Sequence, residues 1–184
     1  MICKVKCLTD WKVVNQLCKY TMGITDCKDE CSDKLKNRLC SSEHSPLRGL
    51  IFLVEMIGIP SWVSVHFVRH KIGVEHFVQS QRPDRTGSNK DRSEMKQGEL
   101  VNHCMLINAE ALINISRKRL CYKASTETRE VWEAVIAELR KIEQGRFLAD
   151  FCVPNCVYRG GLCHEMLPCG RLKEQCSRYY CCIA

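Results

Sequence analysis

A run of apolar residues at positions 50–59 is the feature that most constrains what this chain can fold into. The run is rich in β-branched side chains and is closed by Gly58 and Pro60, a pattern typical of a buried β-strand. Residues 2–7 alternate apolar and polar positions, as a half-buried strand does. We therefore expect strands at both places, with the strand at 50–59 in the interior.

Helical patterns occupy much of the remaining chain. Asp10 and Ser61 are typical N-cap residues, and each precedes apolar residues at helical spacing, which predicts a helix after each of them. Residues 82–99 are almost wholly polar, which predicts a loop. Further helices are expected, from the recurrence of apolar positions every three or four residues, over residues 32–40, 107–120 and 124–142.

Length and composition indicate one globular domain with an unusual end. The chain has 184 residues, of which 45% are hydrophobic and 27% charged, so it can bury a core and is too apolar to be disordered. From residue 151 the composition changes to Cys, Gly, Pro and Arg. We therefore expect a domain at residues 1–150 and a Cys-rich tail at residues 151–184.

The sequence favours a cytoplasmic protein with an anionic partner. The longest apolar stretch, residues 49–68, contains Glu55, Pro60 and His66, which predicts that no segment crosses a membrane. The first six residues lack the apolar core of a secretory signal. The 28 Lys and Arg against 21 Asp and Glu give a net charge of +7.

Fifteen cysteines set this composition apart. In a reducing compartment, clustered cysteines are typically metal ligands or small buried hydrophobes. Four cysteines of the tail have the chemistry of tetrahedral zinc ligands: Cys152, Cys156, Cys163 and Cys169. Because the tail has few large apolar groups, it needs a cross-link such as a metal ion in order to fold. Their spacing lacks paired C-x2-C units, so packed reduced thiols are the alternative interpretation.

Two polar residues lie on the apolar side of the predicted helix at 107–120. Asn108 and Arg119 are eleven residues, about three turns, apart and therefore share nearly one face with its apolar side chains. Burying an amide and a guanidinium is costly unless a partner is present. Either they cap or pair with neighbouring segments, or they contact a polar ligand at an interface.

Basic residues gather at the end of the helix that follows Ser61. Arg69, His70 and Lys71 suit a phosphate or pyrophosphate, although such a run is commonly only a solvated helix end. His66 and His70 are spaced to share a metal ion. Because no third ligand is identifiable, we expect these two histidines to have a packing role instead.

Several motifs between residues 40 and 145 occur in a fixed order. They are a basic triplet, a Ser-x-Arg unit, a further Arg, and a helix with the spacing Asn-x5-Asn-x4-Arg. In chain order their residues are Arg69, His70, Lys71, Ser80, Arg82, Arg92, Asn108, Asn114 and Arg119. The arrangement resembles the flavin-dependent thymidylate synthase (ThyX) family, whose signature is Arg-His-Arg, seven residues, Ser, and an Arg two positions further. A short, divergent member of that family would suit a phage nucleotide pathway.

The resemblance implies a fold and a reaction. The fold would be α+β, with a ThyX-like central sheet flanked by helices and the Cys-rich C-terminal tail outside the family core. The protein would be a homotetramer with FAD at subunit interfaces. In that family NADPH reduces the flavin, and methylenetetrahydrofolate supplies the carbon that converts dUMP to dTMP. The chain departs from the family at Lys71, where the family has Arg, and at His66, where it has a nucleotide-binding Gln.

The same resemblance implies roles for individual residues. Arg119 would be the catalytic residue that polarises the uracil, since a base activated at C5 needs a fixed cation near its carbonyl. FAD would be bound by Arg69, His70, Lys71, Asn108 and Asn114. The nucleotide dUMP would be bound by His66, Ser80, Arg82, Arg92 and Arg119.

Two other functions are compatible with the same residues. One is a flavoenzyme that modifies another pyrimidine nucleotide. The other is a non-catalytic ThyX-like protein, stapled by zinc, that binds a nucleotide or nucleic acid. Aromatic residues make up only 7% of the chain and are not interleaved with basic ones, which disfavours nucleic-acid binding.

Overall fold

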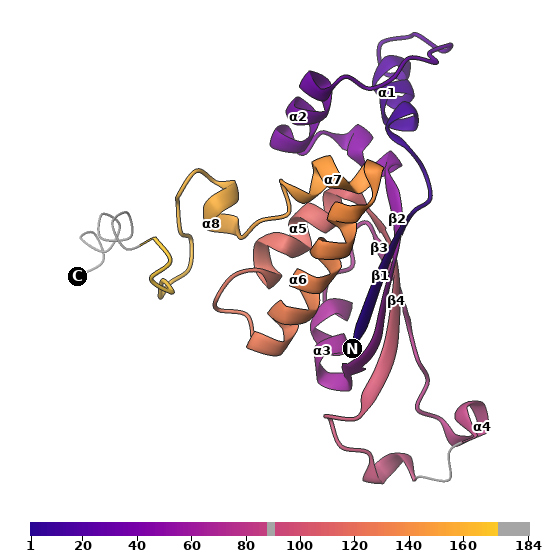
Figure 1. Ribbon diagram of the computed structural model, residues 1–184, viewed down its shortest axis with the longest axis vertical. Coiled ribbons are helices and arrows are strands. Elements are labelled where there is room, and N and C mark those ends of the chain that lie inside the picture. Colours follow the sequence, from indigo (N-terminus) through magenta and orange to yellow (C-terminus); the bar gives the residue numbers. More distant parts are fainter. Residues whose placement is uncertain (88–90, 173–184) are drawn as a thin grey trace.

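The computed structural model describes residues 1–87 and 91–172, and within them four antiparallel strands form one sheet (Figure 1). The strands follow the order β1-β2-β4-β3 across the sheet. Their bounds are Ile2–Cys7 for β1, Ile51–Pro60 for β2, Val74–Val78 for β3 and Leu100–Asn108 for β4. The most apolar segment of the sequence is thus a central strand.

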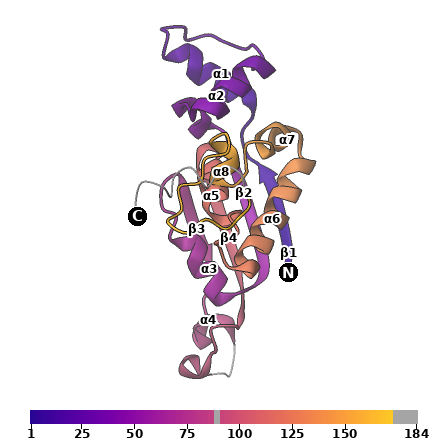
Figure 2. The same ribbon diagram turned by 90° about the vertical axis from the view of Figure 1, so that its left-hand side faces the viewer.

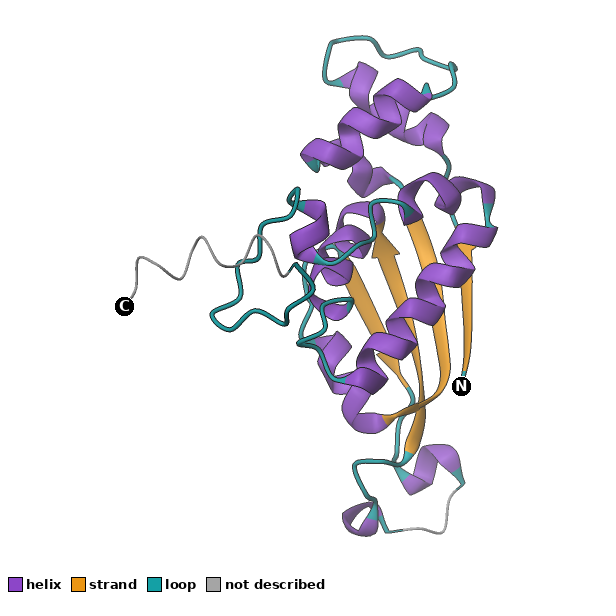
Figure 3. Ribbon diagram, turned by 60° about the vertical axis from the view of Figure 1, so that its left-hand side comes forward, coloured by secondary structure: helices purple, strands orange, loops and turns teal. Residues whose placement is uncertain are grey.

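Helices cover one face of the sheet and extend beyond both of its ends (Figures 2 and 3). The covering helices are α3 (Ser61–Val68), α5 (Ala109–Arg119) and α6 (Thr126–Lys141). One end carries α1 (Trp11–Tyr20), α2 (Asp33–Ser42) and the 3-10 helix η1 (Ser45–Gly49). At the other end, an arm between β3 and β4 carries α4 (Pro83–Thr86) and η2 (Arg92–Glu94). The chain continues after α6 through α7 (Glu143–Ala149) and α8 (Asn155–Tyr158).

The core lies between the sheet and this helical layer. Alternate residues of β2, including Phe52 and Val54, are fully buried and pair in register with buried residues of β4. Trp132 of α6 is also fully buried, and its ring lies 5.4 Å from that of Phe67 on α3. The indole Nε1 donates a hydrogen bond of 2.9 Å to the Ser116 hydroxyl on α5, which satisfies its polar atom inside the core.

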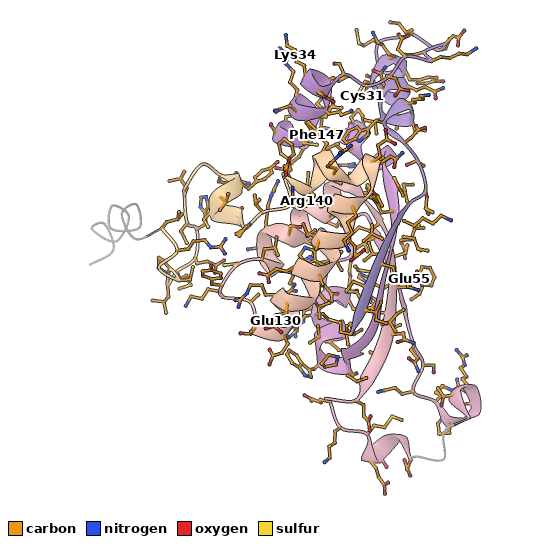
Figure 4. The ribbon with its side chains drawn as sticks, in the orientation of Figure 1. Cys31, Lys34, Glu55, Glu130, Arg140 and Phe147 are labelled. Atoms are coloured by element: carbon orange, nitrogen blue, oxygen red, sulfur yellow. The ribbon has the colours of Figure 1, made fainter. Side chains whose placement is uncertain are left out.

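The opposite face of the sheet is open among the described residues. Glu55 points away from the helices on this face (Figure 4), and Lys4 of β1 is its register partner. Phe77 of β3 lies beside Cys104 in the register and is 61% exposed.

Most of the expected elements are confirmed. The strands at 2–7 and 50–59 are β1 and β2, and the expected helices after Asp10, over 32–40, after Ser61 and over 124–142 are α1, α2, α3 and α6. The prediction at 107–120 is wrong at its start, because residues 107 and 108 end strand β4 and helix α5 begins only at Ala109. The expected loop over 82–99 contains the two short helices of the arm.

The described part of the tail is fastened to the domain by Tyr158. Its hydroxyl donates a 2.7 Å hydrogen bond to the Cys40 carbonyl of α2, and the Arg117 guanidinium stacks 3.8 Å from the centre of its ring. The remaining tail residues, 173–184, lie outside the described residues. Among the described ones, no helix combines the length and apolar character that crossing a membrane requires.

Candidate functional site

Four of the six histidines of the chain lie in one hydrogen-bonded network where α3, β3, β4 and α5 meet. The Ser64 hydroxyl lies 3.0 Å from Nδ1 of His103 on β4. The other ring nitrogen of His103, Nε2, lies 2.9 Å from Nδ1 of His76 on β3. Nε2 of His76 in turn lies 2.6 Å from the carbonyl oxygen of His70.

The hydrogen-bond partners of His76 and His103 indicate which ring nitrogen carries the proton when each ring is uncharged. A carbonyl oxygen only accepts, so Nε2 of His76 carries a proton and donates it. Nδ1 of His76 is then an acceptor and receives the proton of His103 Nε2. Nδ1 of His103 finally accepts from the Ser64 hydroxyl. All three hydrogen bonds therefore point the same way, from the Ser64 hydroxyl through His103 and His76 to the carbonyl oxygen of His70.

Arg119 closes the network from the last turn of α5. Its Nε donates to Nε2 of His70 at 2.9 Å, and its Nη2 donates to the carbonyl oxygen of His66 at 2.6 Å. The ring of His66 lies 2.8 Å from the Thr128 hydroxyl on α6. These bonds use two of the five N–H donors of the half-buried guanidinium. In the described part of the chain, no carboxylate pairs with it.

Burial and nearby positive charge lower the pKa of three histidines of this network, His66, His70 and His103. Burial, then Arg119 and His76, lowers the pKa of His70 to about 4. Burial, then His76, lowers the pKa of His103 to about 4. The pKa of His66 is also lowered, by burial first and by Arg119 and Arg69 second. At neutral pH the site therefore holds neutral acceptors around one uncompensated guanidinium.

Asn108 is the N-cap of α5. Its side-chain oxygen accepts a 2.9 Å hydrogen bond from the Ala111 amide, which confirms the capping alternative for this residue. Its side chain also fills the space in front of Gly73, where an added Cβ would lie 2.5 Å from Nδ2. Gly73 has a φ of +73°, so the turn before β3 needs a glycine for both reasons.

The other expected cofactor residues are exposed beside this network. Arg69 ends α3 and Lys71 follows His70 in the turn toward β3, and both side chains are exposed. Asn114 lies on the exposed side of α5. Within residues 1–87 and 91–172, neither Arg69 nor Lys71 has an acidic partner, so their charges are free to meet an anion.

The remaining expected nucleotide residues belong to the arm, which extends beyond the end of the sheet (Figure 1). Arg82 is exposed and makes two hydrogen bonds, of 3.0 and 2.7 Å, to the Asp84 carboxylate. The Ser80 hydroxyl accepts from the Arg82 amide at 3.3 Å. Arg92 begins η2, and its side chain lies outside the described part of the chain. The structure thus brings His66, His70 and Arg119 together, and Ser80 and Arg82 lie elsewhere.

The four tail cysteines occupy different surroundings. Cys152 is buried in the hydrophobic core, whereas Cys156, Cys163 and Cys169 line a shared hollow. Across the described ranges, no three His, Cys, Asp or Glu side chains are already arranged to hold a metal ion.

The sequence reasoning missed His76 and His103. Both lie on strands that it did not predict, and both point toward the helical layer, where the register of β3 and β4 brings them together. In both strands the histidine directly follows another polar residue and then precedes apolar ones, so neither segment shows the apolar–polar alternation that would have marked it as a strand.

Known structures similar to this chain share one fold. No family model matches the chain, and no curated protein matches its sequence. A structure of flavin-dependent thymidylate synthase ThyX from Helicobacter pylori, complexed with FAD and dUMP, matches with a TM-score of 0.63 at 16% identity, over 82% of this chain and 99% of that chain. A second structure of the same protein with FAD and dUMP gives 0.61 at 16% identity, over 83% and 99%. At this identity the likeness shows a common fold.

Proposed function

We propose that this protein is a cytoplasmic flavin-dependent enzyme that methylates dUMP to dTMP, with methylenetetrahydrofolate as carbon donor and NADPH as reductant. Two independent lines support the proposal. The order and spacing of the sequence motifs resemble the ThyX family, and the fold is similar to structures of ThyX that contain FAD and dUMP. Neither line alone specifies the reaction, because one fold supports many functions.

The observation that carries the proposal is the guanidinium of Arg119. It is half-buried, oriented by two hydrogen bonds that it donates to neutral acceptors, and without a carboxylate partner in the described chain. A cation held in this way is ready to stabilise negative charge on a ligand oxygen. A uracil carbonyl, which gains negative charge when C5 is activated, is such an oxygen. Neutral His70 orients the Arg119 guanidinium through a hydrogen bond and carries no negative charge that would neutralise it.

The exposed basic residues next to this cation fit the flavin cofactor. Arg69 and Lys71 offer two unpaired positive charges within three residues, and a flavin dinucleotide carries a pyrophosphate that needs them. His70, Asn108 and Asn114 complete the proposed FAD site. When bound, FAD supplies the reducing equivalents for the transferred carbon. The protein's own part is to bind the two ligands, hold them together and polarise the uracil.

The arm supports a site shared between subunits of a homotetramer. Ser80, Arg82 and Arg92 belong to the arm, which extends away from the helices that carry Arg119 (Figure 1). A neighbouring subunit is the simplest way to bring an arm to a second Arg119. There the nucleotide phosphate would replace Asp84 as the partner of Arg82, at little cost because this ion pair is solvent-exposed.

Flavin spectroscopy tests the proposal. Purified protein would be mixed with FAD, and the visible flavin band would be followed while dUMP is added. We expect wild-type protein to bind FAD and to respond to dUMP. Arg119→Ala should keep FAD and weaken the dUMP response about tenfold or more, since a lost charged hydrogen bond costs about 1.5–3 kcal/mol. Lys118→Ala is the matched control, because it removes an adjacent exposed charge outside the network.

Three results would contradict the proposal. Failure of the folded wild-type protein to bind FAD would remove the flavoenzyme. An unchanged dUMP response in Arg119→Ala would remove the proposed role of this residue. A flavin band that responds to another pyrimidine nucleotide and not to dUMP would replace the substrate.

A further inference from the structure

Three cysteines from the tail converge on one hollow. Cys156, Cys163 and Cys169 line a small, partly open hollow together with Pro168, Gly170, Arg171 and Leu172. Cys156 is supplied by α8 and the other two cysteines by the irregular segment that follows it. All three thiols are free, so none is committed to a disulfide. Three cysteines on one small hollow offer the ligand type that a tetrahedral thiolate site uses.

The connection between α5 and α6 reaches the same hollow. The Arg171 guanidinium, which lines the hollow, stacks 3.9 Å from the ring centre of Tyr122, and Tyr122 directly follows Cys121. Figures 1 and 2 both draw the segment after α8 beside this connection. Cys121 is therefore the cysteine of the α5–α6 connection that lies next to this hollow in the chain.

Cys152 does not belong to the group, although its spacing in the sequence suggested that it did. Its side chain is 3% exposed and packs in the main hydrophobic core. Burial raises the pKa of its thiol to about 12. A thiol in such surroundings resists the loss of a proton that metal binding requires.

We propose that Cys121, Cys156, Cys163 and Cys169 bind one Zn²⁺ ion as four thiolates. On binding, each thiol loses its proton to solvent and forms one S–Zn bond, so four protons are released and the site carries a net charge of −2. Arg171 lies in the hollow to offset that charge. Among the described residues the thiols are not at metal distance, so binding would require Cys side-chain rotation and movement of the irregular segment that carries Cys163 and Cys169.

This site would connect the tail to the end of the helix that carries Arg119. Cys121 is two residues beyond Arg119, and the three tail ligands are more than thirty residues away in the chain. A zinc staple would therefore restrain the last turn of α5 and the α5–α6 connection. The inference does not depend on the proposed enzymatic function, since it concerns a structural ion.

Metal analysis of four proteins tests this inference. Wild-type, Cys121→Ser, Cys152→Ala and Cys104→Ser proteins would be purified under reducing conditions, and their zinc content measured by elemental analysis. We expect about one zinc per chain in wild type and in the Cys152 and Cys104 variants, and loss of zinc from Cys121→Ser. Cys104 is a suitable control because it is a partly exposed thiol on the open face of the sheet.

Cobalt substitution keeps the test decisive if Cys121→Ser does not fold. Wild-type protein, freed of FAD and loaded with Co²⁺, should show the intense visible and near-ultraviolet absorption of a tetrahedral site with four thiolates. A spectrum of three thiolates, or zinc lost from Cys152→Ala and kept in Cys121→Ser, would overturn the assignment. Wild-type protein without zinc or cobalt affinity, disulfides among these cysteines, or iron with inorganic sulfide would overturn it as well.

Discussion

Replacing His103 by Gln should flatten the pH dependence of the free energy of unfolding between pH 8 and pH 5. His103 is 1% exposed, and its folded pKa is about 4, against 6.5 for an unperturbed histidine. Below pH 6.5, His103 binds a proton in the unfolded chain but remains unprotonated in the folded protein. Stability therefore falls as the pH falls, until the folded histidine itself is protonated near pH 4.

The magnitude follows from the two pKa values. A difference of about 2.5 pKa units corresponds to about 3.4 kcal/mol when the loss is complete. At pH 5, where the unfolded residue is almost fully protonated and the folded one is not, the loss is about 2 kcal/mol. His70, whose folded pKa is also about 4, loses a similar amount. Together, the two histidines therefore lower the free energy of unfolding by about 4 kcal/mol when the pH falls to 5.

Urea unfolding at pH 8 and pH 5, followed by tryptophan fluorescence, measures this loss. His103→Gln should lose about 2 kcal/mol less than wild type between the two pH values, because glutamine does not titrate. Comparing each protein with itself cancels any general destabilisation by the substitution. His164→Gln, which removes an exposed tail histidine, should keep the wild-type dependence. An equal loss in wild type and His103→Gln would refute the assignment of a buried neutral histidine.

Three further substitutions probe contacts that hold the fold and the site together. Trp132→Phe removes the donor to Ser116 and should lower the free energy of unfolding by about 1–3 kcal/mol, measured by urea unfolding; no change would contradict a satisfied core hydrogen bond. Gly73→Ala should destabilise by more than 1 kcal/mol, roughly, because it strains a positive φ and forces the Asn108 amide away; a melting temperature equal to that of wild type would argue against the contact. Tyr158→Phe removes the hydrogen bond to α2 and should speed proteolysis of the tail, with the rest of the domain intact; unchanged cleavage would leave that bond without a role.

The fold was predictable where local pattern and burial agree. β2 is apolar at nearly every position and α6 has its apolar residues at helical spacing, so both could be recognised without knowledge of their neighbours. β3 has only five residues, and two of them are Glu75 and His76, so its identity as a strand depends on pairing with β4. β4 was missed because its last apolar residues continue into α5, and the boundary is set by the cap at Asn108.

The candidate site was predictable only in part, for a similar reason. His66, His70 and Arg119 belong to motifs that can be read along the chain, and the structure brings them into contact. His76 and His103 come from two strands, and only the register of the sheet makes them neighbours. Spacing alone also could not separate Cys152 from the other tail cysteines, because its burial depends on the packing of α5, α6 and α7.

Tritium release from dUMP labelled at C5 tests the central claim most directly. The assay would contain the FAD-loaded protein, methylenetetrahydrofolate and NADPH, and would follow tritium that appears in water when C5 is substituted. We predict release by wild-type protein and by Lys118→Ala, and a loss of about a hundredfold or more in Arg119→Ala, the magnitude typical of removing a preorganised donor to developing charge. No release by folded, FAD-loaded wild-type protein would contradict the account.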